Sequence, residues 1–144
     1  MSEKGDLLDV RDAKIGGKIP FKKWDPSHPE RYSRPITIFD TETGHNDEIL
    51  SLAAIKVVYN NFTRQLEFVD QYERYYHSKD TRSKSYREHL AVHGLTPKII
   101  EKLRKQQARQ QRLKYSEYYS PQEEINFREF FRGSILSGHN IAKA

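Results

Sequence analysis

The longest apolar segment of the chain, EILSLAAIKVVY at Glu48–Tyr59, constrains the possible folds more than any other stretch. Its length and its β-branched residues favour a central strand over a helix. The shorter run PITIF, residues 35–39, precedes it, and QLEFVDQYERYY, residues 65–76, follows it with a period near two. Three successive strands with short connections predict an antiparallel meander.

The region after the meander predicts a polar loop and then a helix. We expect the loop to cover His77–Leu90. Thr96 has the position of an N-cap and Pro97 that of the first helical residue, in a helix that we expect to include Lys98–Lys114. This helix is rich in basic residues and glutamine. Its charges predict either a face that binds phosphates or a solvated charged surface.

A second helix is predicted after Ser120, because Ser120, Pro121 and Glu123 have the spacing of a capping box. Gly133 ends this helix, and SILSGHN, residues 134–140, predicts a short fourth strand. Helices that return the chain to a strand parallel to an earlier one are typical of α/β proteins. We therefore predict an α/β fold whose mixed sheet combines a three-strand antiparallel meander with one parallel strand.

The composition limits the classes of function. The 144 residues suffice for one ordinary domain, and 25 basic against 20 acidic residues give a net charge of +5 and a pI near 9.3. This charge favours a polyanionic partner, although a merely soluble basic protein has the same composition. The chain has no cysteine, which excludes disulfides and thiol catalysis. No apolar run approaches the roughly 20 residues of a membrane span and the N-terminus lacks a signal peptide, so we expect a cytoplasmic protein without a membrane partner.

Residues 1–34 differ from the rest of the sequence. Glycine and proline recur there and no apolar period is sustained. Phe21, Trp24 and Tyr32 are interleaved with lysine and arginine. This pattern predicts either a basic and aromatic arm that stacks on nucleic acid or a linker whose aromatic side chains dock on the domain. We assign residues 1–34 to an N-terminal arm or linker and residues 35–144 to the domain.

Two acidic residues directly follow the apolar run at residues 35–39. Asp40 and Glu42 are two positions apart, so both side chains leave the same face of a strand. Unpaired carboxylates inside a core are costly, and no lysine or arginine follows closely in the sequence. A divalent metal ion, Mg²⁺ or Mn²⁺, is the counter-charge that we predict, because carboxylate oxygens suit both ions. The alternative is a solvated Asp-x-Glu in a loop just beyond the strand.

Three segments together resemble the DEDD superfamily of 3′→5′ exonucleases, in particular the DEDDh branch that includes the proofreading subunit of bacterial DNA polymerase III. IFDTETG resembles the first motif, an apolar strand that ends in Asp-x-Glu-Thr, and matches it at Asp40–Gly44. AVHGLTPKII, residues 91–100, resembles the family's His-Gly-Ile-Thr segment, which opens a helix beside the bound terminal nucleotide. ILSGHNIAKA, residues 135–144, resembles the beginning of the second motif.

The resemblance implies a ribonuclease H-like exonuclease fold and a two-metal mechanism. Two Mg²⁺ or Mn²⁺ ions about 4 Å apart would clamp the scissile phosphate. Asp40 would bridge both ions, and Glu42 would bind one of them and hold the attacking water. For His93, the alternative is a histidine that only caps or packs at a helix start. The substrate-binding residues that the resemblance implies are Thr41, Thr43, Gly44, His93, Leu95, His139 and Asn140.

Two parts of the family's pattern have no match in the 144 residues. The second motif should supply an aspartate five or six residues after its histidine, but Ala144 stands five residues after His139. The third motif, a general-base histidine followed by a fourth carboxylate, has no counterpart either. We therefore expect a C-terminally incomplete exonuclease domain that is inactive alone, because general-base catalysis contributes ~10²–10⁴-fold. We also expect a protein partner or a missing C-terminal segment to cover the sheet.

Three functions compete at this stage. The first is a metal-dependent exonuclease, in the complete parent protein, that removes nucleotides from single-stranded 3′ ends, with DNA favoured over RNA as the substrate. The second is a catalytically silent module that binds nucleic acid or acts as a scaffold with the same fold. The third is an unrelated α/β interaction domain in which the two acidic residues are incidental.

Overall fold

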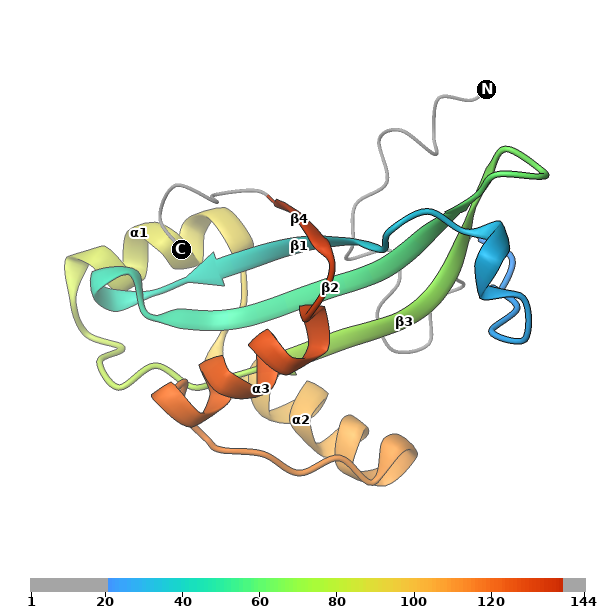
Figure 1. Cartoon of the computed structure of the whole chain (residues 1–144). Coiled ribbons are helices and arrows are strands. Elements are labelled where there is room, and N and C mark those ends of the chain that lie inside the picture. The colour runs from blue at the N-terminus through green and yellow to red at the C-terminus, as the bar shows by residue number, and fades with distance from the viewer. Residues whose placement is uncertain (1–20, 139–144) are drawn as a thin grey trace. The chain divides into compact units, whose positions relative to one another are not determined.

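The computed structural model describes residues 21–138 of the chain (Figure 1). Three strands are followed by three helices and a final short strand. Two short 3₁₀ turns, η3 (Pro29–Arg31) and η4 (His45–Asp47), precede the first and the second strand. The larger elements are β1 (Ile36–Thr43), β2 (Ile49–Asn60), β3 (Gln65–Tyr75), α1 (Lys84–His93), α2 (Pro97–Gln111), α3 (Pro121–Phe131) and β4 (Ile135–Gly138).

The four strands form one mixed sheet in the order β3-β2-β1-β4. Strands β1 and β4 are parallel, with Ile36 opposite Ile135 and Phe39 opposite Gly138. The predicted α/β class and the mixed sheet with one parallel pair are therefore confirmed. No helix within residues 21–138 has the length and apolarity that a membrane crossing requires.

The register of β1 and β4 depends on a small residue. A Cβ atom added to Gly138 would lie 2.3 Å from Cε1 of Phe39, closer than any real contact of this kind. Phe39 is buried, so its ring cannot move aside into solvent. The glycine therefore lets an aromatic ring pack directly against the backbone of the neighbouring strand.

The described chain forms two compact units. Unit 1 contains residues 21–40, 53–72 and 129–138. Its core is centred on Ala53, Ile55 and Val57 of β2, all buried. Burial of each of the β-branched side chains Ile55 and Val57 contributes about 1.5–3 kcal/mol to stability. The segment predicted as the central strand therefore supplies the buried centre of this core. The side chains packed against it are Phe21, Ile36, Ile38, Leu66 and Phe68.

Unit 2 contains Thr41–Leu52 and Glu73–Arg128. Leu50, Tyr75, Tyr86 and Ile100 form its buried cluster. Tyr86 belongs to α1 and Ile100 to α2, so each helix contributes one apolar face to this core. The partly buried leucines of the two helices and of their connection pack against the same cluster.

A hydrogen-bond network fixes the segment that follows α2. Arg104 donates to the carbonyl oxygens of Tyr75 and Tyr115 at 2.7 and 3.0 Å. The Tyr115 hydroxyl donates to the side chain of Gln107 and accepts from the Tyr75 N–H at 2.8 Å. Gln107 is fully buried and donates to the carbonyl oxygen of Glu73 at 2.8 Å. These bonds satisfy polar groups that would otherwise be costly to bury.

Residues 21–34 are attached to the sheet rather than separate from it. The Trp24 N–H donates to the Phe68 carbonyl oxygen at 2.8 Å, and the Phe68 N–H donates to the Lys22 carbonyl oxygen at 2.7 Å. Phe21 packs against the core of unit 1, and the rings of Trp24 and Tyr32 meet edge-on at 5.5 Å. Of the two sequence hypotheses for these aromatic residues, the structure favours docking on the domain.

The prediction of a polar loop over His77–Leu90 is wrong, because α1 occupies Lys84–His93. The Ser83 hydroxyl accepts from the Tyr86 N–H at 3.0 Å and caps the helix, and Gly94 ends it with a φ of 69°. Only a thin apolar face, with Tyr86 buried, holds α1 on the core. Its polar composition concealed the helix, since tertiary packing overrides weak local preference.

Helix α2 is shorter than predicted. Thr96 caps it as expected, accepting from the Ile99 N–H at 3.2 Å. We predicted a helix over Lys98–Lys114, but α2 ends at Gln111 because Arg112 adopts a left-handed conformation with a φ of 52°. Lys114 therefore lies outside the helix.

Helix α3 begins and ends where the sequence predicts. The Glu123 N–H donates to the Ser120 hydroxyl at 3.3 Å, and Gly133 follows the helix with a φ of 78°. The Glu123 carboxylate does not complete the predicted capping box by accepting from the Ser120 N–H. Instead it is buried and accepts from the Tyr76 hydroxyl at 2.8 Å.

Candidate active site

Asp40 and Glu42 both belong to strand β1, which continues to Thr43. The interpretation of the two acids as a strand pair is therefore favoured over a loop beyond the strand. Their separation of two residues places both side chains on the same face of β1 as Ile36 and Ile38. Each is partly buried, between the apolar beginning of the strand and the exposed turn that follows. Each also has an interaction with other parts of the chain.

The turn after β1 is closed by backbone bonds. The Gly44 N–H donates to the Glu48 carbonyl oxygen at 2.9 Å, and the Asp47 N–H donates back to Gly44 at 3.2 Å. Asn46 and Asp47 both have positive φ angles, of 49° and 58°. The turn reverses the chain into β2 within five residues, as the predicted meander requires.

Gly44 has a packing reason to be a glycine. A Cβ atom there would lie 2.9 Å from Leu50 Cδ1 and 3.2 Å from Glu48 Oε1. Leu50 is fully buried in the core of unit 2 and cannot give way easily. The sequence interpretation assigned this glycine to close approach of a nucleotide. The structure gives a second reason, and that approach stays a prediction.

His93 is the last residue of α1, not a residue at a helix start. Its Nε2 lies 2.9 Å from the Thr43 carbonyl oxygen, and its Nδ1 accepts from the Leu95 N–H at 3.0 Å. A carbonyl oxygen only accepts and an amide only donates, so the ring carries its proton on Nε2. The histidine thus connects the end of β1 with the α1–α2 connection, and both of its nitrogens are used within the chain.

Leu95 and Thr41 complete the predicted residues that the structure describes. Leu95 is partly buried and packs against the core cluster of unit 2. Thr41 alternates with Asp40 and Glu42 along β1, which places it on the other face of that strand. His139 and Asn140, the two remaining predicted residues, lie outside the described residues.

The donor set of β1 fits a hard divalent cation in part. Mg²⁺ commonly binds through one or two carboxylates and completes its shell with water and substrate phosphates. Asp40 and Glu42, two carboxylates from one strand face, match that requirement. Within residues 21–138, however, no group of three histidine, aspartate or glutamate side chains is arranged to hold a metal ion. The predicted two-metal site therefore has no complete ligand set in the described residues.

A cluster of His45, Asp80 and Ser83, which joins the turn after β1 to the segment before α1, was not predicted. His45 Nδ1 lies 2.8 Å from the Ser83 hydroxyl, and His45 Nε2 lies 3.8 Å from the Asp80 carboxylate. The Arg82 N–H, which donates to Asp80, holds the pKa of that carboxyl below its ordinary value. The Ser83 hydroxyl is the N-cap of α1, so we interpret the cluster as structural rather than nucleophilic. Asp80 and Ser83, three residues apart before a helix, were the available sequence signal.

Comparison with known proteins identifies no relative. No family model matches the chain, and no significant match is found among curated proteins or solved structures. The resemblance to the DEDD exonucleases therefore stays a prediction carried by the motifs themselves.

Proposed function

We propose that the protein to which this chain belongs is a metal-dependent 3′→5′ exonuclease with a ribonuclease H-like fold. The observation that carries the proposal is the position of Asp40 and Glu42 on one face of β1, the strand parallel to β4. The mixed sheet, in which β4 lies parallel to β1 after three successive strands, supports the fold that the resemblance implies. The proposal includes a cytoplasmic location and single-stranded 3′ ends as substrate, DNA rather than RNA.

Asp40 and Glu42 would hold the metal in this proposal. A bound Mg²⁺ or Mn²⁺ supplies a Lewis acid for the phosphate and lowers the pKa of a bound water. The two carboxylates contribute negative charge and hard oxygen ligands from β1, which lies between β2 and β4 in the sheet. A rigid strand keeps such ligands in place more precisely than a loop would.

The end of β1 supplies the proposed contacts with the substrate. Backbone groups of Thr43 and Gly44 would lie beside the terminal nucleotide, and His93 would support them through its bond to the Thr43 carbonyl oxygen. In this form of the proposal His93 positions the strand end, while Leu95 supports it from the core cluster. His139 and Asn140 would guide the path of the nucleic-acid strand.

The 144 residues alone are expected to be weakly active or inactive. The later aspartates and the general-base histidine of the family's pattern have no match in the sequence. A histidine base contributes typically ~10²–10⁴-fold to a reaction of this kind. A further segment of the protein or a partner would supply those groups.

Degradation of 5′-labelled single-stranded DNA and RNA by the full gene product tests the proposal. We expect shortening from the 3′ end that requires Mg²⁺ or Mn²⁺. Asp40→Asn should reduce the rate by more than about a hundredfold, since even groups that only orient metal ligands contribute 10–100-fold. The matched control is Asp70→Asn, the same change at an exposed position of β3.

Equal rates for Asp40→Asn and Asp70→Asn would overturn the proposed site. Binding of Mn²⁺ to the 144-residue chain, measured by calorimetry, gives a second readout that does not require turnover. We expect Asp40→Asn to weaken it and Asp70→Asn to leave it unchanged. If nucleic acid is bound but never degraded by the full gene product, the silent binding module is the correct function.

A further inference from the structure

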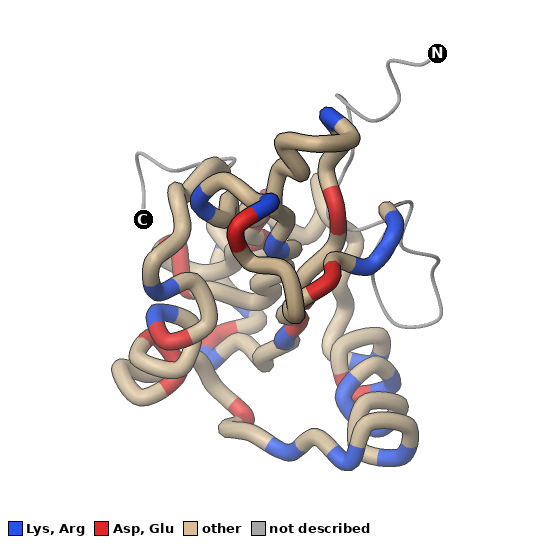
Figure 2. The backbone as a smooth tube through the Cα atoms, turned by 45° about the vertical axis from the view of Figure 1, so that its right-hand side comes forward, with Lys and Arg blue, Asp and Glu red and all other residues tan. Residues whose placement is uncertain are grey.

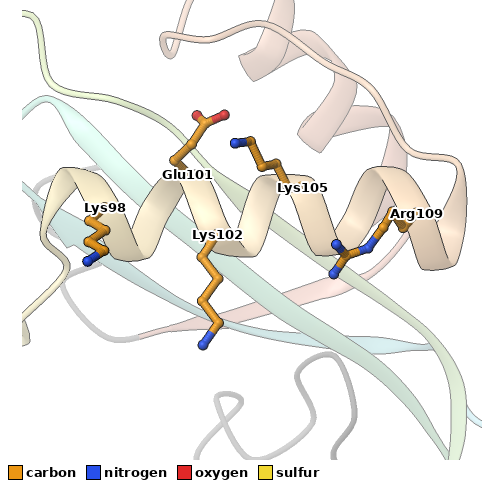
Figure 3. Close-up of a pocket in the computed structure, with 5 residues that line it drawn as sticks. All are labelled: Lys98, Glu101, Lys102, Lys105 and Arg109. Atoms are coloured by element: carbon orange, nitrogen blue, oxygen red, sulfur yellow. The ribbon is translucent and has the colours of Figure 1, made fainter.

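Helix α2 carries four basic side chains in a row. Lys98, Lys102, Lys105 and Arg109 are all exposed and, with Glu101, line one pocket (Figure 3). Their spacings of four, three and four residues, at about 100° per residue, keep them within an arc of about 60° around the helix. We call these four residues the basic row. Basic segments recur along α2 and just after it in the tube view as well (Figure 2).

The opposite face of α2 is held by the core of unit 2. Ile100 is 1% exposed and Gln107 is fully buried, and Leu103 packs against the same cluster. At about 100° per residue these positions are centred roughly 180° from the basic row. Helix α2 therefore cannot turn its charges inward without losing its apolar contacts, and the row faces away from the core.

The basic row has no salt bridge to the residues that the structure describes. Within the part of the chain that the structure describes, none of the four side chains lies within 4.0 Å of a carboxylate. Glu101, the acidic residue beside the row, instead lies 2.9 Å from His77 Nε2. That hydrogen bond, with Lys105 contributing less, holds the pKa of Glu101 below its ordinary value. The row is left as an exposed line of positive charge.

The dimensions of the basic row suit one strand of a nucleic acid. Eleven residues of helix separate Lys98 from Arg109, a rise of about 16 Å. One strand of B-form DNA, with about 3.4 Å per phosphate along the axis, presents roughly five phosphates over that length. A membrane-surface helix would need a free apolar face beside its cations, and the apolar face of α2 is buried.

We propose that the basic row of α2 binds the phosphate backbone of single-stranded nucleic acid. The site is distinct in its residues from Asp40 and Glu42, and the binding does not require catalysis. The contacts would be to phosphates and would therefore carry little sequence preference. The inference adds a binding surface to the proposed function and stands even if the protein hydrolyses nothing.

Fluorescence anisotropy of the chain with a labelled oligodeoxythymidine of about 16 nucleotides tests the row directly. The titration is made in EDTA, so metal binding and hydrolysis play no part. The variant is Lys102→Gln with Lys105→Gln. The matched control is Lys22→Gln with Lys84→Gln, which removes the same charge from two exposed positions outside α2.

Each phosphate contact to a single strand contributes about fivefold to affinity at 0.1 M salt, so we expect the row variant to bind about 25-fold more weakly. The slope of log K against log salt should fall by about 1.4, while the control changes affinity less than about twofold. Lysine and glutamine have similar helix propensities, and an unchanged circular dichroism spectrum checks that α2 remains folded.

Equal losses in the row variant and the control would overturn the inference, because total charge would then explain the binding. Tighter binding to phosphatidylserine vesicles than to the oligonucleotide would overturn it too. A second variant, Lys98→Gln with Arg109→Gln, should give a similar loss from the two ends of the row. The titration in EDTA separates this result from the test of the exonuclease site, which requires Mg²⁺ or Mn²⁺.

Discussion

His93 donates a hydrogen bond from Nε2 to the carbonyl oxygen of Thr43 at 2.9 Å, while its Nδ1 accepts from the Leu95 N–H at 3.0 Å. One side chain thereby joins the end of strand β1 to the connection between two helices. The two bonds require a neutral ring with its proton on Nε2. A histidine that the sequence suggested as a substrate contact thus has a defined structural task within unit 2.

Replacing His93 should destabilise the protein. His93→Ala removes both bonds and leaves the Leu95 N–H and the Thr43 carbonyl oxygen without this partner. We expect the free energy of unfolding to fall by about 1–2 kcal/mol, measured by urea denaturation. His28→Ala is the control. The His28 side chain is 45% exposed and lies 4.0 Å from Asp25 and 3.4 Å from Glu30 at the surface, so we expect a change under about 0.5 kcal/mol. Nitrogen-15 shifts showing the Nδ1–H form of His93 would contradict the assignment of its bonds.

Two threonines should respond oppositely to the same substitution. Thr37 is fully buried, and its hydroxyl has no hydrogen-bond partner within the described residues, so Thr37→Val should stabilise the protein by about 1 kcal/mol. Thr96 caps α2, so Thr96→Val should destabilise it by about 1 kcal/mol. The shift of the urea midpoint measures both effects. A loss of stability in Thr37→Val would show that its hydroxyl is satisfied.

Gly138→Ala should weaken the pairing of β1 with β4. The new methyl group would collide with the buried ring of Phe39, so we expect a loss of roughly 1–3 kcal/mol. A smaller residue at position 39 should relieve the collision. In a double-mutant cycle, Phe39→Leu combined with Gly138→Ala should lose less stability than the sum of the two single changes. Strict additivity would show that the ring and the glycine do not interact.

Stability should fall in alkali partly because of Tyr115. Burial raises the pKa of its hydroxyl above the ordinary value of 10.0. In the unfolded chain the hydroxyl ionises first, so above about pH 10 the unfolded state binds fewer protons and the free energy of unfolding decreases with pH. Below that pH the contribution is constant. We expect Tyr115→Phe to show a shallower decline in alkaline urea titrations, and an unchanged slope would contradict the assignment.

The sequence predicted those helices and strands whose positions are set by residues close together in the chain. The apolar run of β2, the threonine cap of α2 and the glycine after α3 are each recognisable from a short stretch of sequence. The return of β4 parallel to β1 followed from the connectivity of helices and strands. Helix α1 was missed because a single cap and one buried tyrosine, Tyr86, hold a largely polar segment on the core.

The candidate site was predictable only where the spacing of residues along the sequence determines their positions. Side chains two residues apart on a strand point to the same face, and this rule placed Asp40 and Glu42 together on β1. No local rule could show that His93 bonds to a carbonyl fifty residues earlier. Nor could periodicity show that Gly44 lies against Leu50, because that contact depends on how the turn between β1 and β2 folds.

Because β1 pairs with β4, the edge of β1 stays unpaired during synthesis until β4 has been made. Arg34, just before β1, bonds to Gly133 across a separation of 99 residues. At roughly 5–20 residues per second, β1 emerges from the ribosome about 5–20 s before its parallel partner exists. Throughout that interval one edge of β1 is an open template for pairing with another chain. Asp40 and Glu42 lie on this same strand, and charged side chains on an edge strand oppose its pairing with another chain. The two residues proposed to hold a metal would therefore also protect the nascent chain from aggregation.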